Sequence, residues 1–153
     1  MARWPARTWE LGVREFASDG VRLAFIDEGA GDPVLLIHGF ASRVRTNWIE
    51  PGWVSMLRRS GFRVVAFDNR GHGESEKLYD PGQYAARLMA EDARALLDHL
   101  AIARADVMGY SMGARIAAFL ALSHGERVRS VMRGSADAAD SSTWWRSPRC
   151  ATQ

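Results

Sequence analysis

The sequence predicts an α/β fold with a mostly parallel sheet, helices on both faces and a leading antiparallel hairpin. Three observations predict it. Short apolar runs alternate along the chain with segments of helical periodicity. Three of these runs end in glycine-containing loops, as strands do at the ligand-binding edge of a parallel sheet. A length of 153 residues, with 47% apolar and 25% charged residues, is typical of one globular domain.

The first predicted elements are extended. Residues 13–16 and 21–26 alternate apolar and polar side chains around the turn Ser18-Asp19-Gly20, which predicts a hairpin. A second turn over residues 29–33 leads into Val34-Leu35-Leu36-Ile37. This continuous apolar run is typical of a strand buried on both faces.

The next elements alternate helix and strand. A helix is predicted over residues 51–59 and is ended by Gly61, and a strand is predicted over residues 62–67. A second helix is predicted over residues 84–100 because apolar residues recur at steps of three and four. Four charged residues of that helix are expected to face away from its apolar side: Glu91, Asp92, Arg94 and Asp98.

The last predicted elements are a strand over residues 105–108, an apolar helix after Ser111 and a strand over residues 128–131. From residue 132 onward the chain has no Val, Ile, Leu or Phe, so we expect no further sheet strand there. The predicted organisation is therefore an N-terminal extension (1–12), one domain (13–131) and a disordered or out-of-frame tail (132–153).

The stretch GYSMG, from Gly109 to Gly113, fits the pattern G-x-S-x-G. In a nucleophile elbow, a sharp strand-to-helix turn exposes the serine hydroxyl, and small residues on either side avoid clashes. The alternative is a serine that only caps a helix. An apolar strand before Ser111 and an apolar helix after it favour the elbow.

A second loop, His38-Gly39-Phe40, follows the buried strand 34–37. Acyl transfer needs two preorganised N–H donors for the oxyanion. One comes from the residue after the nucleophile, here Met112, and Phe40 is the expected source of the other. The alternative is an ordinary turn at a strand end, which the accompanying elbow disfavours.

The third loop, DNRGHGES, spans residues 68–75. It lacks the spacing of phosphate-binding glycine loops, so nucleotide binding is disfavoured. We interpret it as a structural loop fixed by Asp68, Arg70, Gly71 and Gly73. His72 within it is the first alternative candidate for a catalytic base.

The ordered combination of these three loops, over about residues 16–131, resembles the α/β-hydrolase family, of which this would be the N-terminal part. The likeness is greatest to single-domain esterases, lactonases and carbon–carbon hydrolases that use serine. Haloalkane dehalogenases and epoxide hydrolases place aspartate at the elbow, so Ser111 argues against both. The resemblance implies Ser111 as the nucleophile, the N–H groups of Phe40 and Met112 as the oxyanion hole, and no metal or organic cofactor. Residues supporting the motifs are His38, Gly39, Asp68, Arg70, Gly71, Gly73, Gly109 and Gly113.

In the family that this chain resembles, the catalytic acid and histidine follow the serine. Only His124 follows Ser111 here, and thirteen residues of helix separate them by roughly 20 Å. We expect His124 and His99 to be solvated helix-end histidines. The resemblance thus implies a chain truncated or frameshifted after about Val131, without acid or base and with weak activity at best. The alternative is a non-catalytic α/β-hydrolase-like fragment or a binding protein.

Composition limits the partners. The net charge is +2 with no basic run, so nucleic acid is not expected, and no apolar run is long enough to cross a membrane. A single cysteine, Cys150, and the absence of a signal-peptide pattern predict a cytoplasmic protein. The expected partner is a small-molecule carbonyl substrate, and self-association is expected through an uncovered sheet edge.

Overall fold

The structure is a computed structural model that describes residues 12–134. Six strands form one sheet in the order β1-β2-β4-β3-β5-β6. The elements along the chain are β1 (Arg14–Ser18), β2 (Val21–Glu28), β3 (Asp32–Ile37), η2 (Arg45–Ile49), α1 (Trp53–Arg59), β4 (Phe62–Phe67), η3 (Pro81–Tyr84), α2 (Ala86–His99), β5 (Ala105–Tyr110), α3 (Met112–Ser123), η4 (Gly125–Arg127) and β6 (Val128–Gly134).

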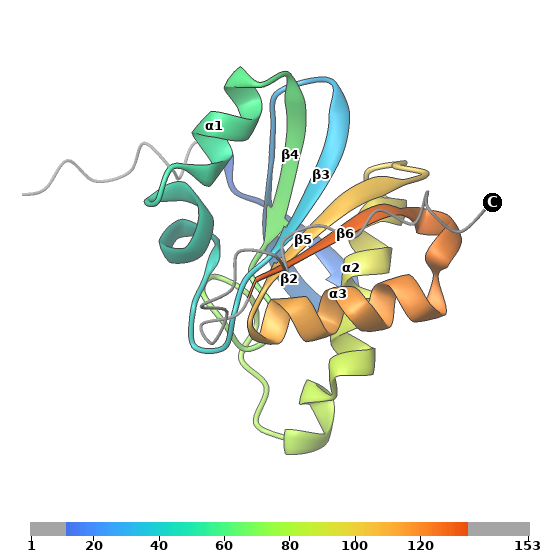
Figure 1. Ribbon diagram of the computed structural model, residues 1–153. Coiled ribbons are helices and arrows are strands. Elements are labelled where there is room, and N and C mark those ends of the chain that lie inside the picture. Colours follow the sequence, from blue (N-terminus) through green and yellow to red (C-terminus); the bar gives the residue numbers. More distant parts are fainter. Residues whose placement is uncertain (1–11, 135–153) are drawn as a thin grey trace, which may run out of the picture.

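The pairing of the strands confirms the predicted α/β class. β1 and β2 form an antiparallel hairpin, and β2 also pairs antiparallel with β4. The remaining pairs, β4 with β3, β3 with β5 and β5 with β6, are all parallel. Because β3, β4 and β5 run in the same direction, the loops that follow them emerge together at the carboxyl ends of these strands (Figure 1).

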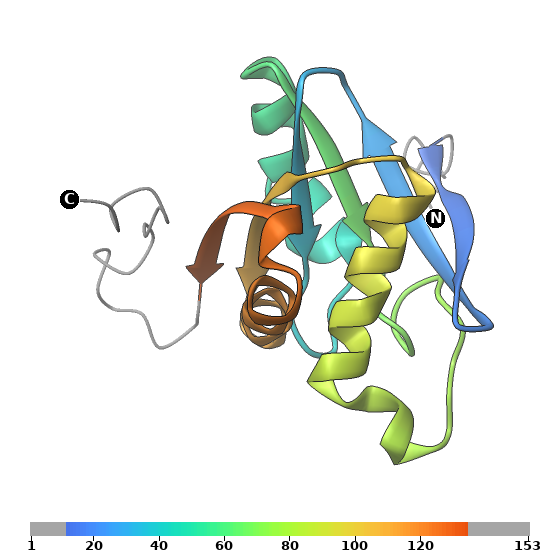
Figure 2. The same ribbon diagram turned by 90° about the vertical axis from the view of Figure 1, so that its right-hand side faces the viewer.

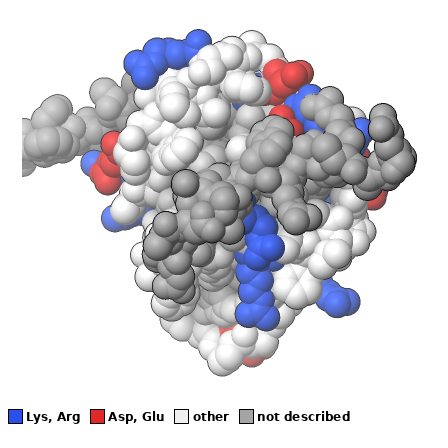
Figure 3. Space-filling model, viewed as in Figure 1, with Lys and Arg blue, Asp and Glu red and all other residues white. Residues whose placement is uncertain are grey.

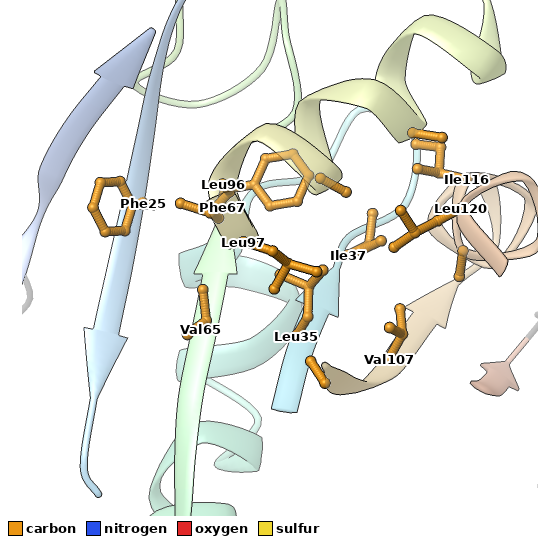
Figure 4. Packing of buried hydrophobic residues seen from close by; sticks show 14 of the residues in the cluster. Phe25, Leu35, Ile37, Val65, Phe67, Leu96, Leu97, Val107, Ile116 and Leu120 are labelled. Carbon is orange, nitrogen blue, oxygen red and sulfur yellow. The ribbon is translucent and has the colours of Figure 1, made fainter. Parts of the chain in front are cut away.

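Alternate side chains of the central strands serve two separate cores. Leu35 and Ile37 of β3 belong to the cluster under α2 and α3, whereas Val34 and Leu36 belong to the cluster under α1 and η2. Helices therefore cover both faces, with α1 on one and α2 and α3 on the other (Figures 1 and 2). Figure 4 shows the larger core, where residues of α2 and α3 lie over the strands. A strand buried on both faces explains why β3 is apolar throughout.

Two predicted boundaries are corrected. β5 runs two residues beyond Met108, to Tyr110, and β6 runs past Val131 to Gly134. In β6, Met132, Arg133 and Gly134 pair with Met108, Gly109 and Tyr110 of β5. Backbone hydrogen bonds to a formed neighbouring strand hold these residues in place without branched aliphatic side chains. The other residues of the predicted tail, and all of the predicted extension except Gly12, lie outside the described part.

A third correction concerns Asp92, which was expected to face away from the apolar side of its helix. Its side chain is fully buried. Asp92 lies three residues after Met89 and four before Leu96, both of which are buried, so it sits at the margin of the apolar stripe. The short helical turn η2 was not predicted from the sequence.

On the described part of the face in Figure 3, charged side chains lie in small separate groups amid uncharged surface. No helix within residues 12–134 combines the length and the apolar character needed to cross a membrane.

Candidate active site

Ser111 lies between the end of β5 and the start of α3, as predicted. Its backbone has φ 53° and ψ −115°, a strained conformation for a residue with a side chain. Its N–H donates to the carbonyl of Gly134 in β6 (2.8 Å), and its own carbonyl accepts from Ala114 (2.9 Å). Hydrogen bonds to β6 and to α3 thus hold the turn, and Ser111 itself is exposed at the carboxyl end of β5.

The two flanking glycines are required by close backbone contacts. A Cβ on Gly113 would overlap the carbonyl oxygen of Ile37 at the end of β3. A Cβ on Gly109 would overlap the carbonyl of Gly113, on the other side of the turn. Glycine at these positions therefore lets the first turn of α3 rest directly on the end of the neighbouring strand.

The loop after β3 lies against the elbow. A Cβ built on Gly39 would lie 3.3 Å from the Tyr110 carbonyl oxygen and 3.4 Å from the Ser111 Cβ. The Gly39 carbonyl accepts from the His38 ring at Nδ1 (2.7 Å) and from the N–H of Ser42 (3.3 Å). The Gly39–Phe40 peptide is trans, so its N–H points away from these two donors.

Two N–H groups are available beside Ser111. Outside the helical and strand ladders, neither the Phe40 nor the Met112 N–H has an acceptor among residues 12–134. The Met112 N–H is one of those that the first turn of α3 leaves without an intrahelical partner. Two such donors beside an exposed serine are what an oxyanion hole requires.

His38 is a positioning residue and is held neutral. It is completely buried, and this burial lowers its pKa to about 4. Its Nδ1–H donates to the Gly39 carbonyl, so Nε2 is free to accept, and it accepts the N–H of Asn69 (2.9 Å). The neutral ring thereby joins the loop after β3 to the loop after β4.

The loop over residues 68–75 is held by the buried carboxylate of Asp68. One of its oxygens accepts the N–H of Val44 and the other accepts the N–H of Glu74, each at 2.8 Å. A Cβ on Gly73, whose φ is 50°, would overlap this carboxylate. Asp68 therefore holds its own loop and also braces the segment that follows Phe40.

Arg70 also fixes this loop. Its guanidinium makes two 2.7 Å hydrogen bonds to Asp92 of α2, and both side chains are almost completely buried. Ser18, at the end of β1, donates to the same carboxylate (2.7 Å). The hydrogen bonds that Arg70 donates to Asp92 raise the pKa of the guanidinium further, so Arg70 stays charged. A Cβ on Gly71 would overlap the ring of Tyr84, so glycine is needed there too.

No histidine contacts the Ser111 hydroxyl, although all four histidines of the chain are described. His38 is occupied on both ring nitrogens. His72 holds the Arg70 carbonyl through Nδ1 (2.9 Å), and His124 holds Glu91 of α2 through Nε2 (2.7 Å). His99 stacks near two phenylalanine rings of the hairpin. Within residues 12–134, the structure thus places the loop after β3 against the turn that carries Ser111, and no histidine in this part contacts the Ser111 hydroxyl.

A cleft of about 440 Å³ opens beside Ser111. Its described lining residues are Gly39, Phe40, Ser42, Thr46, Asn47, Trp48, Pro51, Trp53, Met108, Gly109, Tyr110, Ser111 and Gly134. One wall is aromatic, where Trp48 and Trp53 meet edge to face with ring centres 6.5 Å apart. His72 belongs to a neighbouring hollow and does not line this one. Residues 12–134 also contain no group of three or more His, Cys, Asp or Glu that could hold a metal.

Sequence reasoning assigned no role to Asn47 and Trp48. They lie in η2, which has no apolar periodicity long enough to predict it. The available signal was the Asn-Trp pair itself, shortly after a motif that ends a buried strand.

The comparisons with known proteins agree with this geometry. The family model described as "alpha/beta hydrolase fold" matches residues 32–149, which is more than half of the chain. The chain belongs to the α/β-hydrolase fold family. The match reaches beyond Val131, where the likeness was predicted to end.

Individual relatives of this α/β-hydrolase fold protein are hydrolases. The chain is 40% identical over 133 residues to a 2-hydroxymuconate semialdehyde hydrolase of Pseudomonas sp. (strain CF600), covering 86% of this chain and 46% of that protein. It resembles the structure of an epoxide hydrolase from Vigna radiata with TM-score 0.74 and 25% identity, covering 79% and 38% of the two chains. It also resembles Est816, described as an N-acyl homoserine lactone degrading enzyme, with TM-score 0.69 and 30% identity, covering 78% and 44%. The chain therefore spans less than half the length of each.

Proposed function

We propose that this chain carries the nucleophile and oxyanion hole of a serine hydrolase, which cleaves ester, lactone or related carbonyl substrates through an acyl-enzyme. The observation that carries the proposal is the strained Ser111, exposed between β5 and α3 and beside two N–H groups without described acceptors. Backbone strain at an exposed residue with a nucleophilic side chain is typical of an elbow.

In the proposed reaction, the substrate carbonyl lies over Ser111 in the cleft. As Oγ attacks the carbonyl carbon, water carries its proton to the leaving oxygen and the C=O electron pair moves onto the carbonyl oxygen. The N–H groups of Phe40 and Met112 bind the resulting oxyanion. The positive end of the α3 dipole favours the same charge. Collapse of this intermediate expels the alcohol and leaves the acyl group on Ser111, and water then releases the acid.

Serine at the elbow favours acyl transfer over epoxide opening. By the family resemblance, epoxide hydrolases use an aspartate at this position, and this chain has Ser111 instead. The relatives named for a semialdehyde hydrolase and for lactone degradation agree with a carbonyl substrate. The cleft walls, with Trp48 and Trp53, suit an apolar acyl or leaving group.

We expect residues 1–153 to catalyse the proposed reaction slowly. Serine needs a base to take its proton, and none of the four histidines contacts Ser111. An oxyanion hole and binding alone leave roughly 10³–10⁴-fold acceleration over water. We therefore expect slow acylation of Ser111 and little turnover.

The test is an acylation assay on the 153-residue chain with p-nitrophenyl acetate, read by nitrophenolate release and by intact mass. Ser111 should gain one acetyl group, and Ser111→Ala should abolish that adduct. Ser55→Ala is the matched control, because Ser55 is an exposed serine on α1 whose hydroxyl bonds only the Gly52 carbonyl in the described part. An adduct that persists in Ser111→Ala would contradict the proposal.

The second candidate is a non-catalytic binding protein, and the absence of a histidine contact to Ser111 is the observation that favours it. A binding protein would occupy the cleft without acylation. Saturable quenching of Trp48 and Trp53 by an ester, with no acyl adduct on Ser111, would support this alternative. Rapid turnover that depends on Ser111 would exclude it, and His72 would then be the first base to substitute.

A further inference from the structure

Asn47 connects the loop after β3 to the cleft. Its Oδ1 accepts a hydrogen bond from the N–H of Gly39 at 3.0 Å. The carbonyl of the same glycine accepts from the His38 ring. Asn47 is half-buried and lines the cleft together with Ser111. None of the proposed catalytic steps uses its side chain.

The orientation of the Asn47 amide follows from this hydrogen bond. The Gly39 N–H is a donor, so only the carbonyl oxygen of the amide can face it. The Nδ2 group, which carries two N–H donors, therefore lies on the other side of the amide plane's axis, away from the Gly39 N–H. Within residues 12–134 no acceptor lies in hydrogen-bond reach of Nδ2. A cleft-lining amide with a fixed direction and free donors is suited to bind a ligand oxygen.

This amide lies close to the reacting centre. Asn47 Oδ1 is 3.0 Å from the Gly39 nitrogen, and a Cβ on Gly39 would lie 3.4 Å from the Ser111 Cβ. The distance from N to Cβ within Gly39 links these two contacts, so Asn47 Oδ1 lies within about 9 Å of the Ser111 Cβ. A short acyl chain on Ser111 can span that distance.

The charge of the ligand is also restricted. None of the described residues that line the cleft is a lysine, an arginine or an acid. A carboxylate would lose hydration there without a cation to compensate, whereas a neutral carbonyl oxygen needs only a hydrogen-bond donor. The neighbouring walls, formed by Pro51, Trp48 and Trp53, accept hydrocarbon.

We propose that Asn47 is a specificity-determining residue, whose Nδ2 donates to a neutral keto oxygen on the acyl chain and so selects oxo-acyl esters and lactones. The proposal rests on the proposed function, because it names the substrate class of that same site. A buried hydrogen bond of ordinary strength predicts a preference of roughly 3- to 10-fold over the matched acyl chain without the oxygen.

The test compares two esters of equal chain length, p-nitrophenyl 4-oxopentanoate and p-nitrophenyl pentanoate. The ratio of their Ser111 acylation rates is measured within each protein, after correction for the spontaneous hydrolysis of each ester. Asn47→Asp keeps an oxygen for the Gly39 N–H and removes the Nδ2 donor, and Asn47→Ala removes both. The ratio should fall to about one in both variants.

The matched control is Thr46→Val, which removes a neighbouring cleft hydroxyl and leaves Asn47 intact. Its ratio should equal that of the unaltered protein. A ratio of one in the unaltered protein, a ratio that survives both Asn47 variants, or a ratio lost in Thr46→Val would each overturn the proposal.

Binding separates this inference from the catalytic one. In a Ser111→Ala background, quenching of Trp48 and Trp53 by the two esters reports affinity without chemistry. The keto ester should bind more tightly by a similar factor, and Asn47→Ala should remove the difference. If the unaltered protein is not acylated but the Ser111→Ala protein shows this preference in binding, the proposed function is refuted and the Asn47 site remains supported. Equal affinities would refute the site.

Discussion

Stability at acid pH should depend on His38. Burial lowers the pKa of this histidine to about 4, against about 6.5 in an unfolded chain. The unfolded state therefore binds the proton more readily between these values. The contribution of neutral His38 to the free energy of unfolding is fully present above pH 6.5 and is lost as pH falls toward 4. Integrating between the two pKa values gives a loss of about 2.5 kcal/mol at pH 4.5 relative to neutral pH.

Burial is the main cause of the lowered pKa, and the acceptor role of Nε2 also disfavours the protonated ring. In the folded state it accepts the N–H of Asn69, and a proton on Nε2 would set two donors against each other. The His38→Asn variant removes the titrating group. It should be less stable at neutral pH by about 1–3 kcal/mol, since the buried Asn69 N–H loses its acceptor.

The assay is urea unfolding at several pH values between 7.5 and 4.5, on the unaltered protein and on His38→Asn. The free energy of unfolding should fall more steeply in the unaltered protein, by about 2.5 kcal/mol over this range. Carboxylates whose pKa is lowered by ion pairs, such as Asp27 beside Arg63, add a loss in the same direction to both proteins, so they cancel in the difference. Parallel pH profiles, or a His38 proton resonance that titrates near 6.5, would refute the reasoning.

Three further predictions concern packing and association. Gly113→Ala should lower the free energy of unfolding by about 1–3 kcal/mol through the clash with β3, whereas Gly125→Ala, where a Cβ meets nothing within 4 Å, should change it little. Asp92→Ala should cost about 3–5 kcal/mol by leaving the buried Arg70 without its carboxylate partner. Asp98→Ala on the same helix, which removes solvent-exposed ion pairs to Arg94 and Arg127, should cost about 0–1 kcal/mol; both are measured by urea unfolding. β6 ends the described sheet, so the chain should self-associate through that edge; light scattering that gives a constant monomer mass as concentration rises would contradict this.

The sequence by itself determined the fold class and the strand-to-helix turn at Ser111. Continuous apolar runs such as residues 34–37 specify strands buried on both faces, because no exposed face would tolerate them. The glycines around Ser111 specify a tight strand-to-helix turn, because a Cβ at either position overlaps backbone. The apolar runs and the G-x-S-x-G pattern are short sequence features, so they can be recognised along the chain, although the backbone that Gly113 approaches belongs to the distant strand β3. The family resemblance drawn from them is confirmed by the match over residues 32–149.

Only the tertiary structure decided how polar side chains pair. Asp92 is buried because Arg70, twenty-two residues earlier, pairs with it, and helical periodicity cannot indicate that partner. The Asn47 contact with Gly39 likewise depends on a short turn that no apolar pattern predicts. His38 is neutral because the completed fold removes it from water. The burial of Asp92 and the neutral state of His38 depend on the exclusion of water by distant segments, and that exclusion exists only once the chain has folded.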